Sequence, residues 1–188
     1  MSKWKSIIAS VLVGAFLTGC ISVGMWIIIY FASGKLYTGP DVERKFRMNA
    51  LGSVALCNKK NPVDKWIFHK MNGLYSQFSK EEQEKIVLLN IKNELKKNKE
   101  IEKVMLISSL GNAISESAQF IKTALERDGF IVSEVVNIIG RTDNLEMAEN
   151  FDTAIVVENL NQSKINLTEA ECSTIKEYIP SVSGIVLV

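Results

Sequence analysis

The chain has 188 residues, of which 47% are hydrophobic and 23% are charged, with 22 Lys and Arg against 21 Asp and Glu. A net charge of +1 excludes the overall basic excess that is typical of nucleic-acid-binding proteins. The 3 prolines and 11 glycines are too few for a collagen-like or linker-like chain, and the length suits one domain with an added segment.

The N-terminal segment has no charged residue between Lys5 and Lys35. About 20 apolar residues at about 1.5 Å per residue cross the hydrocarbon core of a bilayer, so this stretch predicts a membrane-spanning helix. Trp4 near one end and Trp26 near the other are placed like the aromatic residues of membrane interfaces. Residues 1–32 are therefore predicted to form an N-terminal transmembrane helix.

A bacterial lipoprotein signal is the alternative interpretation of this segment. Leu17-Thr18-Gly19-Cys20 matches a lipobox, in which Cys20 is lipidated and the preceding residues are removed. Residues 21–32 stay apolar, however, whereas a mature lipoprotein normally begins with a polar tether. The pattern therefore favours the uncleaved span.

Basic residues predict the orientation of the span, because they are enriched on the cytoplasmic side of membranes. Lys3 and Lys5 precede the span, whereas a larger group follows it: Lys35, Arg44, Lys45 and Arg47. We therefore expect a single-pass protein of the cell (inner or plasma) membrane with a cytoplasmic C-terminal domain. Residues 33–65 are predicted to be a basic juxtamembrane connector with one short strand near 50–56.

Residues 66–188 alternate between helical and strand-like patterns. Helices are expected at about 80–97, at 114–125 and from Thr168 onward, and strands at 104–107, 131–139, 153–157 and 184–188. Ser79 with Glu82 and Thr168 with Glu171 have the spacing of N-terminal capping boxes. This alternation predicts an α/β domain with a small, mostly parallel, Rossmann-like sheet and crossover helices.

Ligands of such sheets bind beyond the carboxyl ends of strands, commonly where a loop enters a helix. The candidate is residues 108–117. A phosphate-binding loop needs glycines whose amides surround the anion, a lysine for the outer phosphates and a hydroxyl for magnesium. This loop contains only Gly111 and no lysine before Lys122, and Glu116 would place a negative charge near the anion.

The order of segments resembles the bacterial tyrosine kinases of capsule and exopolysaccharide synthesis and their membrane co-polymerase partners. The similar segments are the span to Ala32, Gly39-Pro40-Asp41-Val42-Glu43-Arg44, Ala50-Leu51-Gly52-Ser53, the 80–97 helix, 104–111, 150–157 and 168–187. The resemblance implies a P-loop-kinase-like domain of the Walker type.

Several departures from the family pattern bear on function. Aligning from Ser108-Ser109 puts Ser115 and Glu116 at the positions of the Walker lysine and hydroxyl, and aligning backward from Gly129 puts Glu116 and Ser117 there. Neither alignment supplies the lysine, and the strand at 131–139 reaches Asn137 where the resemblance implies an aspartate. We therefore expect no catalytic residue and no cofactor at a degenerate loop that comprises Ser108, Ser109, Gly111, Asn112, Ser115, Glu116 and Ser117.

No metal site is expected either. His69 is the only histidine, and the three cysteines, Cys20, Cys57 and Cys172, have no paired spacing. The acidic residues of the 143–152 segment are interpreted as solvated surface rather than a magnesium site: Asp143, Glu146, Glu149 and Asp152.

The resemblance and these departures together imply a shortened, non-catalytic member, a membrane adaptor or regulator of capsular or exopolysaccharide biosynthesis. Its expected partners are the lipid bilayer and a membrane co-polymerase or tyrosine kinase, with homo-oligomers as a further option and nucleic acid excluded. Two alternatives stay open: a divergent nucleotide-binding ATPase or kinase of the same pathway, and a membrane-anchored α/β interaction domain unrelated to polysaccharide.

Overall fold

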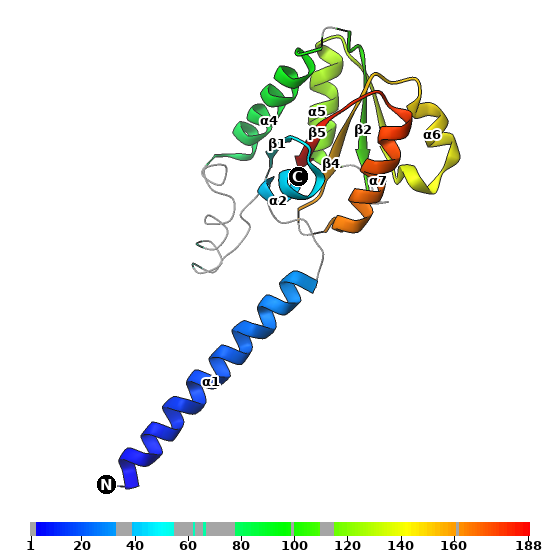
Figure 1. Ribbon diagram of the computed structural model, residues 1–188. Coiled ribbons are helices and arrows are strands. Elements are labelled where there is room, and N and C mark those ends of the chain that lie inside the picture. Colours follow the sequence, from blue (N-terminus) through cyan, green and yellow to red (C-terminus); the bar gives the residue numbers. More distant parts are fainter. Residues whose placement is uncertain are drawn as a thin grey trace. The chain divides into compact units, whose positions relative to one another are not determined.

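The computed structural model contains two compact units, Met1–Gly34 and Lys35–Val188. It describes residues 3–32, 39–54, 62, 66, 78–98, 100–109, 115–160 and 162–188 (Figure 1). His69, Cys57 and the loop residues Gly111 and Asn112 lie outside these ranges.

The first unit is the helix α1, Lys3–Ala32. Its segment Ser10–Ile29 has a mean hydropathy of 2.2 and is long and apolar enough to cross a membrane, a property that signal sequences share. The Thr18 hydroxyl donates to the Gly14 carbonyl at 2.8 Å, and the Ser22 hydroxyl donates to the Thr18 carbonyl at 2.9 Å. These hydroxyls are thus satisfied within the helix, as a hydrocarbon environment requires. The predicted apolar N-terminal helix is confirmed.

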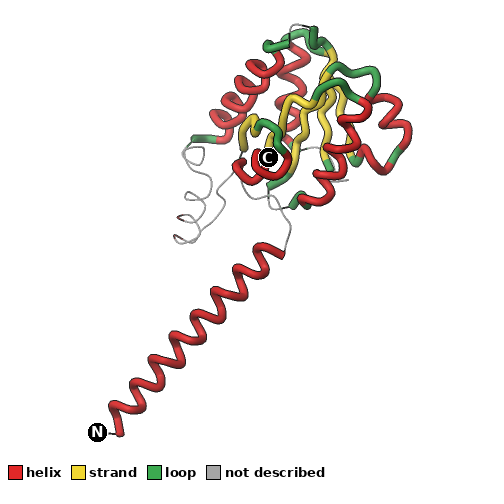
Figure 2. Tube along the Cα trace, in the orientation of Figure 1, coloured by secondary structure: helices red, strands yellow, loops and turns green. Residues whose placement is uncertain are grey.

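The second unit contains a five-stranded sheet in the order β1-β5-β4-β2-β3 (Figure 2). Its strands are β1 Ala50–Ser53, β2 Lys103–Ser108, β3 Ile131–Val136, β4 Thr153–Glu158 and β5 Val182–Leu187. All four neighbouring pairs are parallel, which confirms the predicted α/β class. The helices of this unit are α2 Gly39–Phe46, α4 Lys80–Leu95, α5 Glu116–Arg127, the short 3-10 helix η2 Ile138–Gly140, α6 Thr142–Ala148 and α7 Ile165–Tyr178.

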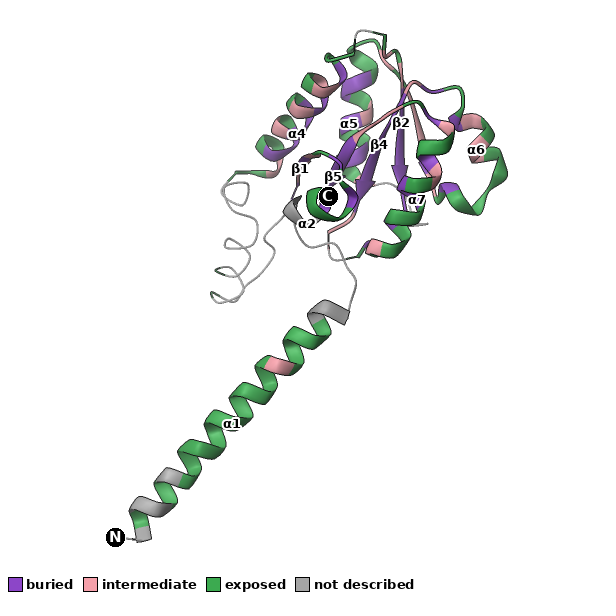
Figure 3. Cartoon of the chain, viewed as in Figure 1, coloured by how far each residue is buried: buried purple, intermediate pink, exposed green. Residues whose placement is uncertain are grey.

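Helices cover both faces of the sheet, so the strands are buried on both sides (Figure 3). Consecutive side chains of β2 point to opposite faces: Met105 and Ile107 join one core cluster, and Val104 and Leu106 join the other. The first cluster includes residues of α2, α6 and α7, and the second includes residues of α4 and α5. This double covering explains the continuous aliphatic runs of the central strands.

Residues 39–54, which the sequence placed in the juxtamembrane connector, contribute α2 and β1 to the α/β unit. β1 lies beside the last strand of the chain, with Ser53 opposite Leu187. Gly184 of β5 has φ +156°, and a Cβ atom there would lie 2.5 Å from the Asn49 carbonyl oxygen. Only glycine at position 184 lets the backbone of β5 lie this close to the backbone at Asn49.

One of the two predicted capping boxes is present. Ser79 and Glu82 exchange hydrogen bonds at the start of α4, with the Ser79 backbone N–H donating to Glu82 Oε2 at 2.8 Å. The prediction for Thr168 and Glu171 is wrong, because α7 begins at Ile165 and both side chains are buried within the helix. The Thr168 hydroxyl donates instead to the Lys164 carbonyl at 3.2 Å.

Candidate functional site

The carboxyl ends of three strands meet at one edge of the sheet, where parallel α/β folds bind ligands. Ser109 follows β2, Asn137 follows β3, and Glu158 is the last residue of β4. The Asn137 backbone N–H donates to the Ser108 carbonyl at 2.9 Å, and Asn137 adopts a left-handed conformation with φ 52°. β3 therefore ends at Val136, earlier than the predicted 131–139 strand, and the chain turns into η2.

The buried carboxylate of Glu158 accepts hydrogen bonds from Ser109, the residue that follows β2. The Ser109 backbone N–H donates to Glu158 Oε1 at 3.0 Å, and the Ser109 hydroxyl donates to Oε2 at 2.6 Å. Burial raises the pKa of Glu158, and these hydrogen bonds act in the opposite direction. The chain thus places its own carboxylate at the predicted ligand position.

Glu158 is not among the residues predicted from the sequence, because the strand that follows the candidate loop along the chain is β3 and not β4. In space, β2 has β3 on one side and β4 on the other. The signal was present in the sequence: Glu158 directly follows the aliphatic run 154–157, as an acidic residue at the end of a buried strand.

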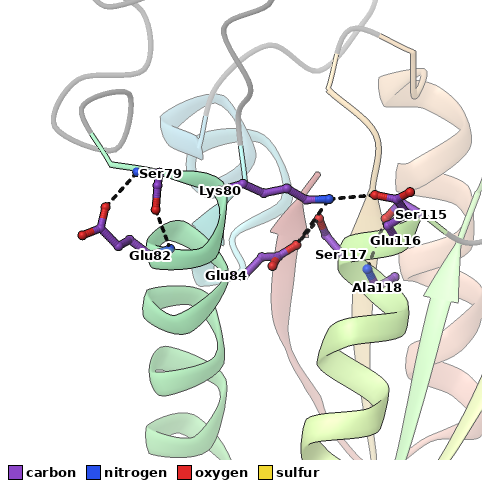
Figure 4. A network of polar contacts seen from close by, with 8 residues as sticks. All are labelled: Ser79, Lys80, Glu82, Glu84, Ser115, Glu116, Ser117 and Ala118. Carbon is purple, nitrogen blue, oxygen red and sulfur yellow. Dashed lines mark hydrogen bonds and ion pairs between the residues drawn. The ribbon is translucent and has the colours of Figure 1, made fainter.

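Polar contacts also occupy the N-terminus of α5 (Figure 4). Ser115 caps the helix, and its Oγ accepts a hydrogen bond from the Ala118 backbone N–H at 3.2 Å. The Ser117 hydroxyl donates to Glu84 Oε1 at 2.8 Å, and both residues are buried. Ser117, a candidate for the magnesium-binding hydroxyl, is therefore bonded to a carboxylate that comes from α4.

A lysine does reach the start of α5, but from another helix. Lys80 Nζ lies 2.8 Å from Glu116 Oε2 and 3.8 Å from Glu84 Oε1 (Figure 4). The hydrogen bond to Glu116 raises the pKa of Lys80, and the same contact lowers the pKa of Glu116. No local motif could have found Lys80, which lies 36 residues before Glu116. Two carboxylates compensate its charge.

The space between β2 and α5 is small. A cavity of about 10 Å³, room for roughly one water molecule, is lined by Leu106, Ile107, Ser108, Ser115, Ala118, Val157, Asn159 and Val188. Pockets for drug-sized ligands and cofactors have volumes of about 300–1,000 Å³. The structure thus brings Ser108 and Ser115 to one small, mostly apolar cavity.

The acidic segment 143–152 forms α6 and the turn that precedes β4. Asp143 and Glu146 are exposed on α6, and no group of three potential metal ligands occurs in the described ranges. Asp152 accepts hydrogen bonds from the backbone N–H groups of Glu102 at 2.8 Å and Lys103 at 2.7 Å, which lower the pKa of its carboxyl. Asp152 therefore connects the starts of β2 and β4.

Neither a protein-family model nor a curated protein matches the sequence. The likeness to the capsule tyrosine kinases rests on the short segments that carry it, and the membership remains a prediction.

Proposed function

We propose that the chain is a non-catalytic membrane adaptor or regulator whose α/β domain binds a partner protein of capsular or exopolysaccharide assembly. One observation carries the non-catalytic part of this proposal. Among the described residues of the edge where a phosphate ligand would bind, both donors of Ser109 are bonded to Glu158 and the Ser117 hydroxyl is bonded to Glu84.

Electrostatics at this edge oppose an incoming phosphate. The N-terminus of a helix favours anions, but at α5 this position already carries Glu116, with Glu84 close by. Lys80 is the cation at this position, and it would have to leave both carboxylates to reach a phosphate. Releasing Ser109 would also leave the buried Glu158 carboxylate without two of its hydrogen bonds, which is unfavourable.

The membrane part of the proposal rests on α1 and on charge. An apolar helix of sufficient length for a bilayer precedes the α/β unit, and the basic residues Arg44, Lys45 and Arg47 follow it. The positive-inside rule then gives a single-pass protein of the cell membrane with its α/β domain in the cytoplasm. A membrane co-polymerase or tyrosine kinase of polysaccharide assembly is the partner that the resemblance suggests.

Magnesium-dependent ATP hydrolysis by the full chain, purified in detergent, tests the non-catalytic claim. We expect hydrolysis at the level of a protein-free control. Saturable hydrolysis that is lost in Lys80→Met, but kept in Lys85→Met, would contradict the proposal. Lys85 is the matched control because it is an exposed lysine on the same helix. That result would favour the divergent nucleotide-binding enzyme.

Deletion of the gene in its native host tests the pathway. We expect a change in the amount or length distribution of the cell-surface polysaccharide, restored by the intact chain and also by Lys80→Met. An unchanged polysaccharide would contradict the assignment to this pathway and favour an unrelated membrane-anchored interaction domain.

A further inference from the structure

A second buried carboxylate, on the helix α7 that packs against β4, is affected by the charge of Glu158. Glu171 belongs to α7, its relative exposure is 0%, and neither carboxylate oxygen has a hydrogen-bond partner among the described residues. Burying an ionised carboxylate without partners is strongly unfavourable, so such a group takes up a proton instead. Glu171 therefore needs an explanation that the adaptor function does not supply.

The groups around Glu171 come from three elements that pack against α7, namely β4, η2 and α6. β4 contributes Glu158, which is also 0% exposed, and η2 contributes the Ile138 backbone amide, which acts to lower the pKa of Glu171. The acidic side chains of α6 face solvent, as do the charged side chains of α2 in the described part of that helix. On α7 itself, Glu169 and Lys176 are exposed and Cys172 is buried.

Burial and the nearby charge of Glu158 raise the pKa of Glu171 to about 8, and the Ile138 amide acts weakly in the opposite direction. The pKa of Glu158 is raised as well. Two interacting carboxyl groups lose their protons in two steps, and the apparent pKa of each step is a property of the pair rather than of one residue.

We propose that the pair Glu158 and Glu171 carries a single proton at neutral pH, and that release of this proton opens the joint between α7 and the ends of β2 and β4. With the proton bound, one negative charge is buried, and the Ser109 donors stabilise it. After its release, two negative charges occupy the same buried edge. Glu171 can regain water only if the first turns of α7 separate from β4 and η2, which loosens the Ser109 contact. The joint is a proton-operated switch.

The direction of the pH effect follows from linkage. A carboxyl group whose pKa is higher in the folded state than in the unfolded state contributes stability below its unfolded pKa, and this contribution is lost as pH rises. For Glu171 the window extends from the ordinary glutamate value of about 4.3 up to about 8. Within it the ratio of folded to unfolded protein decreases by up to about tenfold per pH unit.

The test is a carboxyl titration of the full chain in detergent micelles, followed by NMR of protein labelled with carbon-13 at the glutamate side-chain carboxyl. Between about pH 5 and about pH 10 we expect one resonance to titrate near the value given for Glu171. This resonance should disappear in Glu171→Gln and persist in Glu169→Gln, which removes an exposed glutamate of the same helix. In Glu158→Gln the midpoint should move to lower pH, because the neighbouring charge is gone.

Amide exchange provides the conformational readout. After correction for the intrinsic pH dependence of exchange, the Ser109 amide should lose protection above the midpoint in the wild-type chain, but not in Glu171→Gln. Titration of every glutamate in the ordinary acidic range would overturn the proposal, and so would unchanged Ser109 protection across the midpoint. A midpoint that millimolar magnesium moves to acidic pH would also overturn it, because the pair would then be a cation site. The wild-type titration decides the matter even if a variant fails to fold.

Discussion

Ser109 and Glu158, which lie 49 residues apart in the sequence, are joined by two hydrogen bonds to the two oxygens of one buried carboxylate. The contact ties the end of β2 to the end of β4 at the edge where parallel α/β sheets normally receive ligands. Because the acceptor is a carboxylate, these bonds are of the stronger, charge-assisted kind. The edge is therefore organised around an anion that belongs to the protein.

Removing the Ser109 hydroxyl should destabilise the domain. Ser109→Ala leaves Glu158 Oε2 without the 2.6 Å hydrogen bond, and we expect a loss of about 1–3 kcal/mol in the free energy of unfolding. Denaturant unfolding of the full chain in detergent, followed by circular dichroism, measures the loss. Ser173→Ala, at an exposed serine of α7, is the control and should change stability by less than about 0.5 kcal/mol. Equal effects of the two variants would refute this role of the contact.

Ser117 and Glu84 should be energetically coupled. Their side chains form a 2.8 Å hydrogen bond between α5 and α4, and both are buried. In a double-mutant cycle of Ser117→Ala and Glu84→Ala, we expect a coupling energy of about 0.5–3 kcal/mol in unfolding experiments. Strictly additive single effects, within about 0.3–0.5 kcal/mol, would mean that the bond does not hold the two helices together.

Two glycines with positive φ should differ in their tolerance of alanine. A Cβ at Gly184 would lie 2.5 Å from the Asn49 carbonyl oxygen and 2.8 Å from Leu51 Cγ, whereas a Cβ at Gly129 meets no atom within 4 Å. Gly129→Ala should therefore lower the free energy of unfolding by only about 1 kcal/mol, because alanine is less favourable than glycine in the left-handed conformation. Gly184→Ala should cost clearly more and weaken the pairing of β1 with β5. Melting temperatures of the two variants give the comparison, and a smaller loss for Gly184→Ala would contradict the packing described here.

Acid should remove the stability that Asp152 provides. The backbone N–H groups of Glu102 and Lys103 lower the pKa of Asp152 in the folded state, so its contribution is present above the unfolded pKa. It is lost as pH decreases through the lower, folded value. Asp152→Asn should therefore reduce stability at neutral pH and flatten the decline in stability below about pH 4. Parallel pH profiles for Asp152→Asn and the wild-type chain would show that the two hydrogen bonds do not favour the ionised form.

The α/β class could be predicted because each buried strand is a short aliphatic run and each helix repeats its apolar residues at helical spacing. The β4 run at 153–157 and the Ser79 capping box are local signals of this kind, and both are present. β1 was assigned to a connector because its four residues acquire meaning only beside β5, more than a hundred positions later. The capping box predicted from the spacing of Thr168 and Glu171 is absent for a related reason. Both side chains face the core, and sequence spacing alone does not show this.

The sequence places the candidate loop after β2, and the structure describes part of it, Ser108, Ser109 and residues 115–117. The lack of a lysine in the loop is a property of the sequence, whereas the groups that replace a ligand come from elsewhere in the chain. Lys80 and Glu84 reach α5 from α4, and Glu158 reaches Ser109 from β4. Such contacts depend on the order of the strands and on helix packing, which local motifs do not encode.

Nucleotide binding to the full chain tests the central claim most directly. A ligand that binds only the folded state stabilises it and so raises the unfolding temperature. The stabilisation is about 2.7 kcal/mol when the ligand concentration is one hundred times the dissociation constant. Because the Ser109 and Ser117 hydroxyls are bonded to Glu158 and Glu84, we expect no change in melting temperature at millimolar ATP with magnesium. A saturable increase in melting temperature that requires both ATP and magnesium would contradict it.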